Sequence, residues 1–189
     1  MVKPDRKRNR LVGYNYSREG LYFVTSCVQD KACVFGYVAD GEMVLNKYGQ
    51  IAETQWHWLA EQYPYVVLHV FVVMPNHVHA ILEIDQGFDT DLYGKDSQMT
   101  AKERFFGNDS DRSRPVPTRK IKSISELMGV YKTTTSKLIR QAGLNNFAWQ
   151  RSFHDHIIRH ERAYRHIMQY ILNNPALWQE DVFYQESLS

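Results

Sequence analysis

Two scarcities narrow the class of protein at the outset: cysteines are few, and long apolar runs are missing. Among the 189 residues, Cys27 and Cys33 are the only cysteines. They form no disulfide framework and lack the Cys-x-x-Cys spacing of a zinc site, so we expect a reducing, cytoplasmic location. The longest apolar stretches, such as VVLHVFVVM, are too short to span a bilayer. The basic start MVKPDRKRNR leads into no apolar segment, which argues against a signal peptide and a membrane partner.

A large net charge is also absent, because the formal charge at pH 7 is only +2. The charge is nevertheless unevenly distributed: residues 83–111 are mainly acidic, and residues 112–166 are mainly basic. A basic region on a nearly neutral chain indicates a face for a polyanion, although a solvated surface would give the same pattern. With 43% hydrophobic residues, we expect residues 1–189 to form a single domain with an adequate core.

Apolar periodicity predicts an α+β fold. The expected elements are strands at 21–28, 66–74 and 77–84, a helix at 46–61, a helix from Ser123 to about Gly143, a strand or bulged strand at 147–159, and a helix at 161–174. The first six follow the β-α-β-β-α-β order of a ferredoxin-like sandwich, and the C-terminal helix is an addition. Residues 86–120 lack periodicity and are rich in Gly, Asp, Ser and Pro, so we expect a flexible surface insertion there.

Local signals mark where these elements begin and end. Asn46 is suited to cap the first helix, and Ser123 with Glu126 fits a capping box for the second. Asp40-Gly41 predicts a tight turn. Pro175 should end the last helix.

The segment VVMPNHVHAILEI, residues 72–84, places two histidines two positions apart in an apolar run. Side chains two apart on a strand point to the same side, so His77 and His79 could supply two ligands to a divalent ion, which would need a further ligand such as an oxygen. A structural or surface role is the alternative. A histidine-triad hydrolase would need a histidine at position 81, which is Ile81.

The C-terminal helix carries a second pair of polar residues. Tyr170 and Asn174 are four residues apart and therefore share one helix face. Taken alone, Tyr170 could simply pack in the core, and Asn174 could cap the helix.

Three stretches together indicate a protein family far more specifically than either pair of residues alone. They are VVMPNHVHAILEI, WQRSFHDHIIR and HIMQYILNNPALW. They resemble HUH single-strand nucleases, and within these the REP-associated tyrosine transposase branch of the single-tyrosine transposases. The resemblance implies that His77, His79 and Asn174 are metal ligands and that Tyr170 is the nucleophile. It further implies a Mg²⁺ or Mn²⁺ cofactor and a single-stranded DNA endonuclease and strand transferase, active in DNA transposition and recombination.

The implied chemistry is physically coherent. A divalent ion would polarise a phosphodiester and neutralise developing charge. Attack by the tyrosine would give a 5′-phosphotyrosyl intermediate, which stores the bond energy for rejoining. We expect single-stranded DNA with hairpin-forming repeats as the partner.

Basic side chains in the second half of the chain are the candidate DNA-binding residues. They could track phosphates along one face. These residues are Lys120, Lys122, Lys132, Lys137, Arg140, Arg151 and Arg159. Trp149 and Phe153 could stack unpaired bases, although core packing is the interpretation we prefer for both.

Two other functions stay open from the sequence. One is a nucleic-acid-binding regulator without catalysis, derived from a transposase, which would keep the basic face but not need Tyr170. The other is a metal-dependent hydrolase acting on RNA with water as nucleophile. Relatives of the resembled family include monomers and dimers that exchange the tyrosine helix, so a homodimer also stays open.

Overall fold

The computed structural model describes residues 15–87 and 121–185. Most of the expected insertion at 86–120, including Lys120, lies outside this range. The main sheet has four antiparallel strands in the order β4-β5-β1-β6. Its strands are β1 (Gly20–Cys27), β4 (Val66–Val73), β5 (His77–Ile84) and β6 (His154–Ile158). The helices are α1 (Lys47–Gln62), α3 (Ile124–Gln141) and α4 (Glu161–Asn173), with short 3₁₀ helices η1 (Gln29–Lys31) and η2 (Trp178–Glu180).

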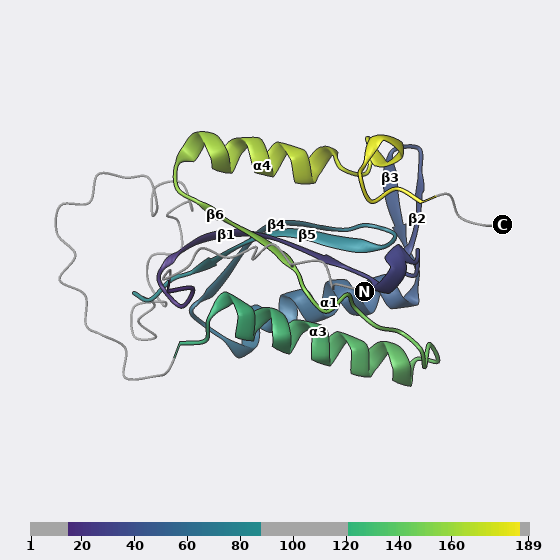
Figure 1. Cartoon of the computed structure of the whole chain (residues 1–189), viewed down its shortest axis with the longest axis horizontal. Coiled ribbons are helices and arrows are strands. Elements are labelled where there is room, and N and C mark those ends of the chain that lie inside the picture. The colour runs from purple at the N-terminus through teal and green to yellow at the C-terminus, as the bar shows by residue number, and fades with distance from the viewer. Residues whose placement is uncertain (1–14, 88–120, 186–189) are drawn as a thin grey trace, which may run out of the picture.

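The expected ferredoxin-like sandwich is confirmed. Strand β5 lies between β1 and β4. Helix α1 therefore connects two strands that are not neighbours, as in a split βαβ unit. Helices α1 and α3 cover one face of the sheet, and α4 lies along the other (Figure 1). None of the helices in the described ranges has the length and apolar character that a membrane span requires.

The predicted caps and turns are present. The Asn46 side chain accepts hydrogen bonds from the first-turn amides of α1, and Ser123 forms a reciprocal capping box with Glu126 at the start of α3. Asp40 and Gly41 have φ values of 51° and 77° and join β2 (Gly36–Ala39) to β3 (Glu42–Leu45). This hairpin forms a separate two-stranded sheet, which the six-element order did not include.

The strand predicted at 147–159 is wrong in its first half. Only residues 154–158 pair with β1, and the preceding segment touches the strand through a single bridge between Val28 and Trp149. Side chains of α3 bind the carbonyls of this segment instead: Lys132 Nζ donates to Gln150 O, and Arg140 donates twice to Phe147 O. The carbonyls of Phe147 and Gln150 therefore accept hydrogen bonds from side chains of α3 rather than from a neighbouring strand.

The two faces of the sheet bury different side chains. Val78, Ala80, Leu82 and Ile84 of β5 join the large core beneath α1 and α3. Trp149 is buried in this core and Phe153 packs against it, as we expected for both. Beneath α4 the apolar cluster is small, with four fully buried members. These are Leu21, Ile81, Ile158 and Ile171.

Candidate active site

Strand β5 brings His77 and His79 to the α4 face of the sheet. All eight residues of β5 are buried, so the two imidazoles are enclosed rather than placed on an open surface. Their ring centroids are 4.4 Å apart, and both side chains are almost completely inaccessible. The paired histidines therefore lie on one face, as the period of two predicts.

A neighbouring amide fixes the protonation of His77. The Nδ2 group of Asn76 donates to the carbonyls of Lys31 and Phe183, at 3.0 and 2.8 Å. This orients Asn76 Oδ1 toward His77 Nδ1, 2.8 Å away, so His77 Nδ1 must carry the proton and donate. Burial lowers the pKa of His77 to about 3. The ring is neutral, and its Nε2 lone pair is buried with no hydrogen-bond partner within the described part of the chain.

His79 is held in a similar way from the neighbouring strand. Its Nδ1 lies 2.7 Å from the hydroxyl of Thr25, the residue directly opposite it on β1. Burial, and then the nearby His77, keep the pKa of His79 well below its usual value. Such partners on the outer ring nitrogen orient an imidazole whose other nitrogen binds a metal.

Helix α4 places Tyr170 against His79. The tyrosine Oη lies 3.0 Å from His79 Nε2, and its ring meets Phe23 edge-on at 6.2 Å between centroids. The side chain is 39% exposed, so it faces solvent as well as the histidines. Burial, and then the charge of Asp181, raise the pKa of Tyr170 to about 12. The phenol is therefore protonated at neutral pH.

Asp181 enters the site from the segment that follows α4. Its Oδ2 accepts from Asn174 Nδ2 at 2.7 Å and lies 3.4 Å from Tyr170 Oη. Its Oδ1 accepts from the backbone N–H of Phe183 at 2.7 Å. This carboxylate is thus fixed in position between the tyrosine and the end of the helix.

The donor atoms fit a divalent cation. One ligand atom from each of His77, His79 and Asp181 can be chosen so that all three lie within 4.8 Å of one another. The Oδ1 atom of Asn174 is also buried and has no hydrogen-bond partner among the described residues. Neutral imidazole nitrogens and carboxylate or amide oxygens are ligands for ions such as Mn²⁺ and Zn²⁺.

The chain beyond α4 folds back over the histidines. The ring of Phe183 lies 4.7 Å from that of His77, and Trp178 of η2 lies 5.9 Å from it. Lys31 Nζ secures this return by donating to Val182 O. Aromatic rings of this returning segment therefore cover the imidazoles.

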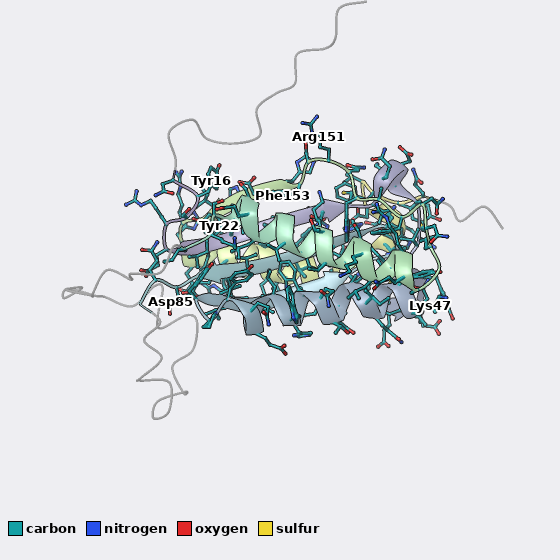
Figure 2. All side chains as sticks on the ribbon, turned by 90° about the horizontal axis from the view of Figure 1, so that it is seen from below. Tyr16, Tyr22, Lys47, Asp85, Arg151 and Phe153 are labelled. Atoms are coloured by element: carbon teal, nitrogen blue, oxygen red, sulfur yellow. The ribbon has the colours of Figure 1, made fainter. Side chains whose placement is uncertain are left out.

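A basic groove lies beside α3, on the other side of the sheet from α4. Its volume is about 590 Å³, and four of the expected DNA-binding residues line it. These are Lys132, Lys137, Arg140 and Arg151. Figure 2, viewed from the α1 and α3 side, shows Arg151 projecting from the edge of the molecule away from α1. We refer to this feature as the basic groove.

The remaining expected DNA-binding residues are not part of this groove. Arg159 lines a second cavity near the start of α4. Lys122 precedes α3, where its Nζ lies 5.9 Å from the ring centroid of Tyr63. Lys120 lies outside the described residues.

Sequence reasoning missed Asp181, Thr25 and Asn76. Asn76 could have been suspected, because it directly precedes the first histidine in the Met-Pro-Asn joint. Thr25 and Asp181 carry no spacing signal, since register and the return of the chain after Pro175 bring them to the site.

Comparisons with known proteins agree with this architecture. No family model matches the chain. A protein of Haemophilus influenzae described as uncharacterized is 33% identical over 180 residues, which cover 95% of this chain and 93% of the relative. A solved structure of a REP-associated tyrosine transposase bound to a REP hairpin has a TM-score of 0.51 and 19% identity, covering 93% of this chain and 73% of that one. The chain therefore belongs to the family of the Haemophilus influenzae protein, and it has the fold of a REP-associated tyrosine transposase.

Proposed function

We propose that this protein is a metal-dependent, single-strand-specific DNA endonuclease and strand transferase. The observation that carries the proposal is the 3.0 Å approach of Tyr170 Oη to His79 Nε2 within one chain. A tyrosine hydroxyl, two neutral imidazoles and a carboxylate thus converge at a partly exposed position. The transposase that shares this fold is bound to a DNA hairpin, which supports hairpin DNA as the substrate class here.

His77 and His79 would hold the cation, with an oxygen from Asp181 or Asn174. The cation, when bound, would polarise the phosphate and offset the negative charge of Asp181. Mg²⁺ and Mn²⁺ are the ions we propose. Neutral histidines are required for this role, and burial already keeps them neutral.

In the proposed step, Tyr170 Oη forms a bond to phosphorus as the bond from phosphorus to the 3′ oxygen breaks. The tyrosine gives its proton to Asp181, and the departing oxygen takes a proton from solvent to become a 3′-hydroxyl. Asp181, 3.4 Å from the phenol oxygen, is placed to accept the tyrosine proton. Because burial, and then the charge of Asp181, raise the pKa of Tyr170 to about 12, attack should be slow until a bound cation favours loss of the phenol proton.

The test is covalent capture. The protein is incubated with a labelled single-stranded hairpin oligonucleotide and Mn²⁺, and adducts are separated on a denaturing gel. We expect an adduct that EDTA prevents and that peptide mass spectrometry assigns to Tyr170. Tyr170→Phe removes only the hydroxyl and should reduce the adduct to background. Tyr37→Phe, at an exposed tyrosine of β2, is the matched control and should leave it unchanged.

Three results would contradict the proposal in different ways. An adduct yield unaffected by Tyr170→Phe would exclude this nucleophile. Cleaved DNA without a protein link would indicate water as the nucleophile. Hairpin affinity that survives EDTA, without cleavage of any substrate, would favour the non-catalytic regulator.

A further inference from the structure

A chain of buried hydrogen bonds links two strands to α4, away from the candidate metal ligands. Glu83 Oε2 of β5 lies 3.0 Å from His69 Nε2 of β4, and His69 Nδ1 lies 3.1 Å from the hydroxyl of Tyr164 on α4. The side chains of His69 and Glu83 are only 3% and 4% exposed. None of the three is among the residues that fit a cation. We call His69, Glu83 and Tyr164 the buried triad.

An irregularity in β4 directs His69 toward α4. Between Leu68 and Phe71 the pairing of β4 with β5 shifts its register, and both of these side chains pack against the core beneath α1 and α3. The two residues between them both face α4, because His69 reaches Tyr164 and Val70 packs in the cluster beneath that helix. Regular alternation would send one of them to the other face. A β-bulge therefore adds a polar contact to α4 without removing an apolar one.

The order of donors and acceptors fixes the buried triad. A carboxylate only accepts, so His69 Nε2 donates to Glu83, and in the neutral ring Nδ1 then accepts from the Tyr164 hydroxyl. Burial, and then the charge of Glu83, raise the pKa of Tyr164, so this hydroxyl keeps its proton for the bond. Separating His69 from Glu83 would leave buried polar groups unpaired, which is costly. Tyr164 therefore has an acceptor that is held in one place.

The two polar attachments of α4 behave differently in the proposed reaction. The contact of 3.0 Å between Tyr170 Oη and His79 Nε2 must break, because the phenol oxygen bonds to phosphorus and the imidazole nitrogen holds the cation. The bond from Tyr164 to His69 involves no reacting group, so it remains. Tyr164 and Tyr170 are six residues apart, which is about 9 Å along the helix axis. The persisting contact is therefore less than two turns from the candidate nucleophile.

We propose that the buried triad positions the candidate nucleophile: Tyr164, held by His69 and Glu83, sets where α4 lies on the sheet and thereby how Tyr170 approaches the phosphate. The effect on the reaction rests on the function proposed above, whereas the effect on α4 does not. The members of the buried triad are positioning residues, because they touch neither the substrate nor the metal ligands. A displacement of about 1 Å at a reacting atom can slow a reaction by about 100-fold, so a contact outside the site can control the rate.

The experiment measures the rate of adduct formation under single-turnover conditions, with Mn²⁺ and with protein in excess over a labelled hairpin oligonucleotide. Tyr164→Phe removes only the hydroxyl and should lower the maximal rate by about 10- to 100-fold. The protein concentration that gives half of this rate should stay as in wild type, because the buried triad does not bind DNA. Tyr48→Phe, at a half-buried tyrosine of α1, is the matched control and should change neither value.

Variants of Glu83 separate positioning from general damage. Glu83→Gln keeps an oxygen that can accept from His69 Nε2, so it should retain most of the rate. Glu83→Ala should be about as slow as Tyr164→Phe. The double variant with Tyr164→Phe and Glu83→Ala should be no slower than the slower single variant, because both changes break the same chain of hydrogen bonds.

Amide hydrogen exchange provides a readout that needs no reaction. Tyr164→Phe should speed exchange in α4 by about 3- to 10-fold, the effect of one lost hydrogen bond on local opening, and leave α1 unchanged. An unchanged adduct rate, a rate loss that Tyr48→Phe reproduces, additive losses in the double variant, or unchanged exchange in α4 would overturn the inference. Wild-type protein that forms no adduct would contradict the proposed function, and exchange in α4 would then decide whether the buried triad holds the helix.

Discussion

One face of the sheet carries most of the apolar core, and the other carries the candidate active site. The side chains of strand β5 alternate between these two faces. Its even-numbered residues are apolar and enter the core beneath α1 and α3. Its odd-numbered residues include His77, His79 and Glu83, which face α4. Alternation along one strand thus allows polar groups to be buried on one face while their immediate neighbours enter the core on the other.

Polar contacts hold α4 where the other face relies on apolar packing. Toward its N-terminal end, Tyr164 Oη bonds His69, which bonds Glu83 at 3.0 Å. Toward its C-terminal end, Tyr170 meets His79. Polar contacts are directional, so they fix the helix position with little apolar burial. We therefore expect α4 to be positioned accurately but to contribute less to global stability than α1 and α3.

The largest expected loss of stability comes from a substitution in the core beneath α1 and α3. Trp56 of α1 is fully buried and packs edge-on against Tyr131 at 5.1 Å between centroids. Trp56→Ala should lower the free energy of unfolding by about 3–5 kcal/mol, because a large ring leaves a cavity behind. Urea unfolding monitored by circular dichroism measures the loss.

Tyr170→Ala supplies the contrast on the α4 face. The tyrosine is 39% exposed, so its truncation should cost about 1 kcal/mol or less while removing the proposed nucleophile. Similar losses for the two variants would contradict the division between the faces.

The fold was predictable wherever local chemistry sets it. Asn46, Ser123 and Asp40-Gly41 act within a few residues of themselves, and the elements they delimit are found almost as expected. The strand at 147–159 was only partly correct, because long-range bonds from Lys132 and Arg140 remove its first half from the sheet. Hydrogen bonds from a distant helix cannot be predicted from the local sequence pattern of the strand.

The candidate site follows the same rule. His77 with His79, and Tyr170 with Asn174, were identifiable because each pair lies within one strand or one helix. Asp181 was not, since the carboxylate reaches the histidines only after the chain turns back beyond α4. The sequence also could not separate Arg159 from the basic groove, which depends on the path of β6 into α4.

A smaller effect, on Mn²⁺ affinity, should distinguish Asn76, which contacts His77 on the α4 face, from Ser26, which lies on the other face. Asn76 holds the proton on His77 Nδ1, so Asn76→Ala should weaken Mn²⁺ binding by about 10- to 100-fold. Isothermal titration calorimetry measures the affinity. Asn76→Asp keeps an acceptor for His77 Nδ1, so it should lose less Mn²⁺ affinity than Asn76→Ala, although it cannot donate to the two carbonyls.

Ser26→Ala is the control on the other face. Ser26 lies next to Cys27 but opposite Val78, and its hydroxyl is buried without a hydrogen-bond partner among the described residues. Its removal should leave Mn²⁺ affinity unchanged and stability unchanged or slightly higher. Loss of Mn²⁺ affinity in Ser26→Ala would show that the two faces are coupled.

A graded effect should appear on mild acidification. Above pH 6.5 the buried histidines are neutral in both the folded and the unfolded chain, so their full contribution to stability is present. As the pH falls below 6.5 the unfolded chain takes up protons that the folded chain refuses, because burial holds the pKa of His77 near 3. Stability should therefore fall with decreasing pH, by up to about 1.4 kcal/mol per pH unit for each histidine.

Urea midpoints measured in EDTA between pH 8 and pH 4 test this slope. The double variant His77→Gln with His79→Gln should flatten it. Excess Mn²⁺ binds the neutral rings of the folded chain, so it should raise the midpoint at pH 7 and steepen the fall below it. A slope unchanged in the double variant would mean that the acid sensitivity arises elsewhere, and that the buried imidazoles are not the titrating groups on the α4 face.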